Sequence, residues 1–123
     1  MGEQHYERFL PGDEVPLRLE IQHPRMRLDE VGVALAHEER PEIELLVSGQ
    51  TEPAGNSRVA KLTLLVPAGA MPGLYRVNRM WVTTYGGRVF NYEGEEVAEF
   101  ASNFAFEVLD EPDEKPELRL SYR

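Results

Sequence analysis

The histidines and serines of this sequence follow no spacing that supports catalysis. The three histidines, His5, His23 and His37, lie far apart, and the segment after His37 lacks the second histidine that a zinc-protease helix carries one turn later. No serine lies in a G-x-S-x-G nucleophile elbow, and no glycine-rich phosphate-binding loop occurs. The sequence therefore predicts no catalytic residue, no cofactor and no enzyme. A small hydrolase whose site assembles only in the folded chain is an alternative.

Two acidic clusters hold the candidate ligands for a hard metal ion. They are Glu93, Glu95 and Glu96, and then Asp110, Glu111, Asp113 and Glu114. Carboxylate oxygens suit calcium, but the spacing does not match an EF-hand loop. Charged runs in loops are most often solvated, and the absence of cysteine removes thiolate metal sites and disulfides. We therefore predict no metal site.

Aromatic side chains gather on one predicted hairpin, at Trp81, Tyr85 and Tyr92. Exposed aromatic rings stack on sugars or anchor protein partners, so these three are candidate binding residues. The opposite interpretation buries the ring of Trp81. Strand alternation from an inward Tyr75 places Trp81 on the same face, unless a bulge shifts the register. We expect Trp81 in the core, with an exposed Trp81 as the alternative.

The C-terminal residues alternate as a strand does. Apolar side chains at Leu118, Leu120 and Tyr122 are separated by Arg119 and Ser121. Such a strand would close the domain's own sheet, join a following domain or add to an edge of another copy. A frayed terminus is the alternative interpretation. Pro112 and Pro116 make the preceding acidic linker a semi-rigid spacer, which favours exchange between subunits.

Composition limits the class of protein and of partner. A chain of 123 residues with 41% hydrophobic residues fits one folded domain. The net charge of -9 opposes binding to nucleic acid or anionic lipid and favours a basic partner. No apolar run approaches the roughly 20 residues of a membrane span, and the first ten residues do not form a signal peptide. We expect a cytoplasmic protein if the chain is complete, and an exported one if it is part of a surface protein.

The hydrophobic periodicity is predominantly that of strands. Seven segments alternate or run apolar between turn signals, at residues 15–21, 31–36, 43–48, 59–66, 74–84, 89–92 and 104–108. Residues 50–57 and 93–96 are predicted as loops, and a helix over residues 29–40 is an alternative to the second strand. We predict an all-β protein, an immunoglobulin-like antiparallel β-sandwich of about seven strands over residues 1–110. Residues 111–123 form an acidic linker and a C-terminal pairing strand.

Several short motifs resemble those of bacterial immunoglobulin-like domains. They are Val66-Pro67, Pro72-Gly73-Leu74-Tyr75-Arg76-Val77, Val82-Thr83-Thr84, Phe106-Glu107-Val108 and, more loosely, Gly12-Asp13-Glu14-Val15. The family's T-D-x-x-G-N turn is here Thr83-Thr84-Tyr85-Gly86-Gly87-Arg88, so no calcium-binding role of its acid transfers. The resemblance implies a spacer, adhesion or ligand-binding module, often exported and repeated, and it implies no reaction.

These observations favour a non-enzymatic binding or assembly module. It would engage a protein partner or form a homo-oligomer through Leu118, Leu120 and Tyr122. A carbohydrate-binding module that uses exposed aromatic residues around Trp81 is the alternative. Nucleic acid and membrane insertion are not expected.

Overall fold

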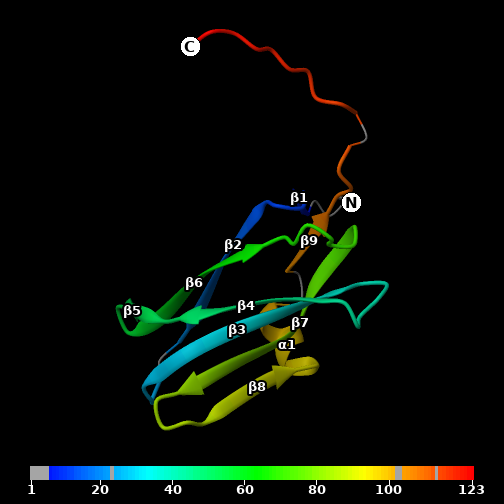
Figure 1. Ribbon diagram of the computed structural model, residues 1–123. Coiled ribbons are helices and arrows are strands. Elements are labelled where there is room, and N and C mark those ends of the chain that lie inside the picture. Colours follow the sequence, from blue (N-terminus) through cyan, green and yellow to red (C-terminus); the bar gives the residue numbers. More distant parts are fainter. Residues whose placement is uncertain (1–5, 23, 102–103, 113) are drawn as a thin grey trace, which may run out of the picture.

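The chain folds into two β-sheets that curl around a common core, and the all-β prediction is confirmed (Figure 1). The computed structural model describes residues 6–22, 24–101, 104–112 and 114–123. Five strands of the larger sheet follow the order β1 (Glu7–Phe9), β9 (Ala105–Val108), β7 (Gly73–Thr84), β3 (Leu28–His37) and β4 (Glu44–Gln50). A sixth strand, β8 (Val89–Glu93), also pairs with β7. The smaller sheet has the order β2 (Glu14–Ile21), β6 (Ser57–Leu65) and β5 (Glu52–Ala54).

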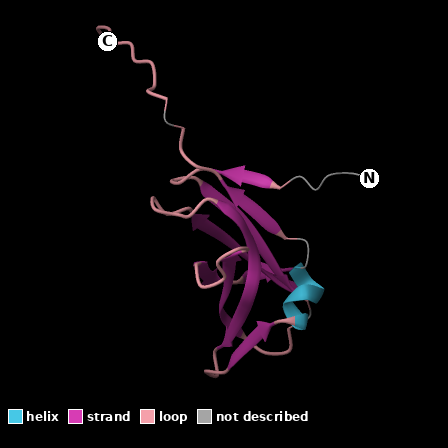
Figure 2. Cartoon of the chain, turned by 90° about the vertical axis from the view of Figure 1, so that its right-hand side faces the viewer, coloured by secondary structure: helices cyan, strands magenta, loops and turns pink. Residues whose placement is uncertain are grey.

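The long strand β7 organises the larger sheet. It pairs with β3 along one side, while two shorter strands share its other side. Its first four residues pair with β9, and residues 79–83 pair with β8. The helix α1 (Glu95–Ala101) carries the chain from β8 to β9 (Figure 2). Since β7 holds both β8 and β9, it fixes where β9 and the segment after it lie.

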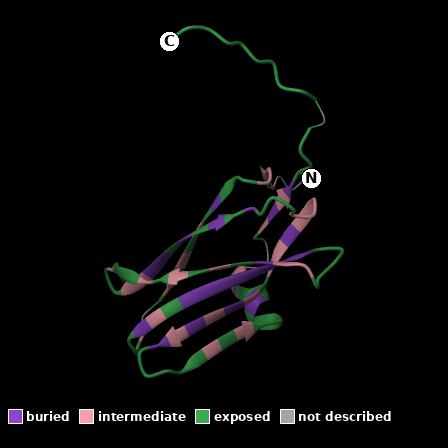
Figure 3. Cartoon of the chain, in the orientation of Figure 1, coloured by how far each residue is buried: buried purple, intermediate pink, exposed green. Residues whose placement is uncertain are grey.

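The core lies between the two sheets. Strands β2 and β6 contribute alternate residues to it, which is the period-two pattern visible in the sequence. Strand β3 is buried along most of its length (Figure 3). Strands β4 and β7 pair with its two edges, and the Trp81 ring lies against Gly32. The largest fully buried side chains are those of Tyr75, Phe106 and Leu35. The alternative of a helix over residues 29–40 is wrong, since β-branched residues and Gly32 favour the strand.

A register shift in β7 makes the core prediction for Trp81 wrong. Leu35 pairs with Val77, but the next residue of β3, Ala34, pairs with Arg79. Asn78 is therefore an extra residue in β7, and the side chains beyond it change faces. Met80 and Val82 point into the core, while Trp81 is half-buried on the outer face of the sheet.

The structure also differs from the expected loops and strand count. The predicted acidic loop at residues 93–96 is instead the end of β8, Gly94 and the start of α1, which runs from Glu95 to Ala101. Gly94 enters the helix with a φ of +59°, two glutamates occupy the first turn, where the helix dipole favours negative charge, and Val97 is buried. The short strands β1 and β5 raise the described strands to nine, and β1 pairs with β9 in parallel, so the larger sheet is mixed.

Candidate protein-binding site

The segment after β9 extends away from the two sheets without forming a strand of either (Figure 1, Figure 2). Its three alternating apolar side chains are almost wholly exposed, Leu118 at 90%, Leu120 at 99% and Tyr122 at 104%. We call residues 118–122 the C-terminal segment. Because apolar side chains lower the free energy when they leave water, a run of this kind fits a surface that pairs with something else.

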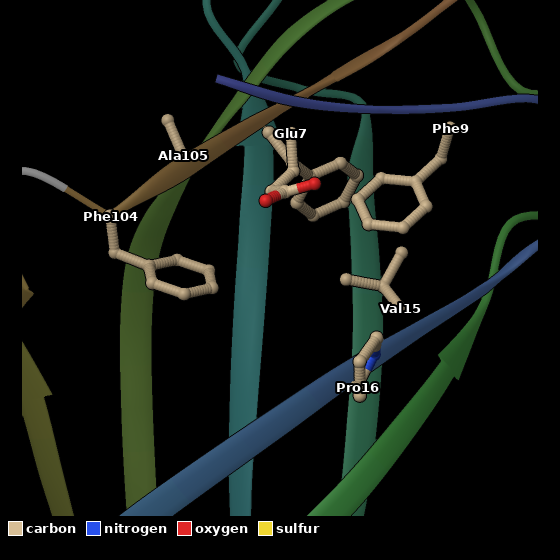
Figure 4. Close-up of a pocket in the computed structure, with 7 residues that line it drawn as sticks. Glu7, Phe9, Val15, Pro16, Phe104 and Ala105 are labelled. Carbon is tan, nitrogen blue, oxygen red and sulfur yellow. The ribbon is translucent and has the colours of Figure 1, made fainter. Parts of the chain in front are cut away.

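A groove opens where the two sheets meet beside the start of this tail (Figure 4). Its volume is about 400 Å³, within the range of pockets that bind ligands. Strands β1 and β2, together with residues 104–106, supply its walls. We call it the aromatic groove, and it is lined by Glu7, Phe9, Val15, Pro16, Phe104, Ala105 and Phe106.

The floor of the aromatic groove is rigid because it belongs to the core. Phe106 and Val15 are both buried. The Phe9 ring meets Phe106 edge-on at 5.6 Å, and Phe106 stacks on Tyr75 at 5.9 Å. Phe104, by contrast, is 42% exposed and its ring faces the same space (Figure 4). The groove therefore has a buried apolar floor and one apolar wall, Phe104, that is exposed to solvent.

One carboxylate lies among these apolar side chains. Glu7 is exposed, and no described residue forms a hydrogen bond or an ion pair with its side chain. The neighbouring Arg8 is already paired with Glu107 across β1 and β9, at 3.2 Å. The groove thus presents an apolar surface with a negative charge beside it, which suits apolar residues next to a cation.

The structure does not bring Trp81, Tyr85 and Tyr92 together into one binding surface. Tyr92 pairs with Met80 and packs against the core, so it lies on the opposite face from Trp81. Tyr85 lies in the hairpin turn, with the Arg27 guanidinium 4.8 Å from its ring centre. A sugar-stacking platform needs adjacent rings on one face, and these residues do not form one.

Trp81 itself is held against the sheet. Its indole lies so close to Gly32 of β3 that a Cβ at position 32 would be 2.0 Å from the ring. The Arg79 guanidinium lies over the indole, 5.4 Å from its centre, and Arg79 also pairs with Glu44 at 3.4 Å. These contacts explain why a large ring on the outer face is only half-exposed.

His37, the histidine within the described residues, makes contacts that hold the fold together. His37 is buried, and its Nε2 lies 2.8 Å from the Pro72 carbonyl oxygen. Its Nδ1 accepts hydrogen bonds from the backbone NH groups of Glu39 and Arg40, at 3.1 and 3.2 Å. This pattern fits a neutral imidazole with its proton on Nε2. His5, His23 and the acid Asp113 lie outside the described residues.

Within residues 6–22, 24–101, 104–112 and 114–123, no cluster of three or more metal-binding side chains occurs. The same part of the chain contains no helix long and apolar enough to cross a bilayer. Three of the described ionisable groups have shifted pKa values. Burial raises the pKa of Tyr75, and hydrogen bonds from Asn78 and Arg79 lower the pKa of Glu44. The hydrogen bond with the Tyr6 hydroxyl raises the pKa of Arg76.

Sequence reasoning missed the aromatic groove. Three residues of β1 are too few to show a period, and nothing in them indicates a parallel neighbour a hundred residues away. Phe104 was read with Phe106 as one strand face, whereas β9 begins at Ala105 and Phe104 lies in front of it. Only the closure of β1 onto β9 places Glu7 and Phe9 beside Phe104.

Comparison of the chain with models of known protein families, with curated proteins and with solved structures finds no match in any of the three.

Proposed function

We propose that this protein is a non-enzymatic assembly module of the immunoglobulin-like class, which engages a protein partner through its C-terminal segment. The carrying observation is the near-complete exposure of Leu118, Leu120 and Tyr122 on a segment of alternating apolar residues that pairs with none of the described strands. When an extended segment of this kind docks on a partner, its alternate side chains supply specificity.

The order of the strands supports the immunoglobulin-like assignment. In that class the strands B, E and D form one sheet, and G, F and C form the other. Here β2, β6 and β5 have the first arrangement, and β9, β7 and β3 have the second. Tyr75, near the start of β7, donates a hydrogen bond of 2.7 Å from its hydroxyl to the Met71 carbonyl, as the tyrosine corner of that class does.

The uneven distribution of charge along the chain supports self-association, although the net charge of -9 on each copy opposes it. The tail from Lys115 to the C-terminus contains three of the 13 basic residues and one of the 22 acidic ones. The rest of the chain is therefore strongly acidic, and it attracts a basic segment from another copy. A carbohydrate-binding function loses its support with the separation of the three aromatic residues.

Absolute mass by light scattering over a range of concentrations tests the proposal. The full chain should form an oligomer, and a chain that stops at Glu114 should be monomeric. The described residues beyond 114 make no contact with the core, so the shortened chain should fold, which circular dichroism will check. The variant Leu118→Ser/Leu120→Ser is the full-length counterpart, and Glu117→Gln/Ser121→Ala, which changes the alternate positions, is its control. The same oligomeric state for all four chains would refute self-association through the C-terminal segment.

A further inference from the structure

We propose that the aromatic groove of one copy receives the C-terminal segment of a second copy, in a reciprocal dimer. This inference rests on the proposed function and names the surface that receives the segment. The tail that carries the segment leaves the sheets beside β1, which lines the groove (Figure 1), and both the groove and the segment expose apolar side chains. The segment contributes apolar side chains and an arginine, and the groove contributes an apolar cavity and a carboxylate.

The side chains of the two surfaces are complementary in kind. In an extended chain, Leu118, Leu120 and Tyr122 would lie on one face, with successive side chains about 7 Å apart. The groove offers Phe9 and Phe104 as apolar walls for such side chains. Its exposed phenylalanine and the exposed leucines would leave water together, which is the contribution that drives apolar association.

The charges are complementary as well. Arg119 lies between the two leucines, and Arg123 follows the tyrosine. Glu7 lies at the groove, and no described residue forms an ion pair with it. In an extended segment both arginines lie on the face opposite the leucines, so the exposed carboxylate of Glu7 attracts the positive charge of the segment as a whole rather than pairing with one arginine inside the groove. A partner with acidic residues at these positions would be repelled.

The path of the chain favours exchange over return to the same groove. The tail leaves the sheet beside β1, where the Leu109 NH donates a hydrogen bond of 2.9 Å to the Phe9 carbonyl. The linker then contains Pro112 and Pro116, which favour extended backbone and resist a sharp reversal. An extended tail that starts at one groove reaches the groove of a second copy in a two-fold pair, and that pair makes the same contact twice.

The free edge of β2 is shaped for a side-chain contact rather than for a full strand ladder. Pro16, which lines the groove, has no NH and belongs on an edge strand with its nitrogen turned outward. An incoming strand would therefore meet an edge that lacks one donor. This arrangement also hinders pairing between the edges of two identical sheets.

Mixing two full-length variants tests the inference. One variant, Leu118→Ser/Leu120→Ser, has an intact groove, and the other, Glu7→Lys/Phe104→Ser, has an intact segment. Both variants change exposed side chains, and circular dichroism checks that they fold. Each alone should show a dimer dissociation constant raised at least about 100-fold, as the loss of two buried apolar contacts implies. Mixed in equal amounts, they should form a dimer that uses the one intact pair.

The matched control for the groove variant is Glu30→Lys/Leu46→Ser, which makes the same charge change and a similar apolar loss at exposed residues of β3 and β4. It should associate as the unmodified chain does. If the segment variant is monomeric but the groove variant dimerises normally, only the groove is refuted. The groove is also refuted if Glu30→Lys/Leu46→Ser fails to dimerise while Glu7→Lys/Phe104→Ser dimerises normally, because the segment then docks at β4. If the segment variant dimerises normally, or the unmodified chain is monomeric throughout, the proposed self-association fails too.

Discussion

The contact between Gly32 and Trp81 allows a test of whether the Trp81 indole lies on the outer face of the larger sheet. In Gly32→Ala, the new Cβ would lie 2.0 Å from one ring carbon of Trp81 and 2.1 Å from the next. Carbon atoms in contact are separated by about 3.5–4.0 Å, so the indole must move outward by roughly 1.5 Å. The backbone at Gly32 does not have a positive φ, so the effect of alanine there is steric.

Two effects of opposite sign set the size of this change. Overpacking a well-fitted site destabilises a protein by about 1–3 kcal/mol. Replacing a strand glycine with alanine stabilises it by about 0.5–1 kcal/mol where space allows, because the unfolded chain loses freedom. Gly32→Ala should therefore destabilise the intact protein but stabilise the Trp81→Ala variant. The coupling between the two changes should reach about 1.5 kcal/mol or more.

Fluorescence and urea unfolding measure both parts of this prediction. The chain has one tryptophan, so its emission reports Trp81 alone. Gly32→Ala should shift the emission to longer wavelength, as the ring moves toward water. Gly69→Ala is the control, since a Cβ there meets no atom within 4 Å. Unchanged emission with additive unfolding free energies would show that the indole does not lie over Gly32, and would refute the register shift at Asn78.

Two further predictions concern groups with shifted pKa values. Tyr75→Phe removes the hydroxyl that donates to Met71 and should lower the unfolding free energy by about 1–2 kcal/mol below pH 9. Because burial raises the pKa of Tyr75, its neutral form stabilises the fold until the pH rises past about 10. Urea unfolding should therefore show the two chains converging at alkaline pH, and a constant difference would contradict the assignment. Asn78 and Arg79 hold the pKa of Glu44 below 4.5, so its carboxylate stabilises the fold above that pH and loses the effect as the pH falls. Glu44→Gln should flatten the acid side of the stability curve between pH 5 and pH 3, and an unchanged slope would assign the acid sensitivity to other carboxylates.

The strands that alternate strongly were predictable from the sequence. Segments such as β2 and β6 bury one face against the other sheet, so their apolar residues must recur with period two. The turn at Gly86-Gly87 was equally visible, because a tight hairpin needs the positive φ that Gly87 has. Short-range sequence patterns were sufficient to predict these strands and this turn, because each depends only on residues within the segment itself.

The sequence predicted the properties of the C-terminal segment only in part. Its alternation and its prolines were evident in the sequence, but the sequence allowed closure of the domain's own sheet as well as exposure. The structure leaves Leu118, Leu120 and Tyr122 in water, and which partner covers them is the subject of the mixing experiment.

By itself, the sequence determined the all-β class, the position of most strands and the acidic character of the surface, because these depend on residue types and local spacing. The tertiary structure alone decided the face of Trp81, since one extra residue at Asn78 reverses every side chain after it. It also decided the aromatic groove, which exists because β1 pairs with β9 across a hundred residues. No local pattern encodes such a pairing, because its stabilisation comes from burying Phe9 against Phe106 once the rest of the sheet is in place.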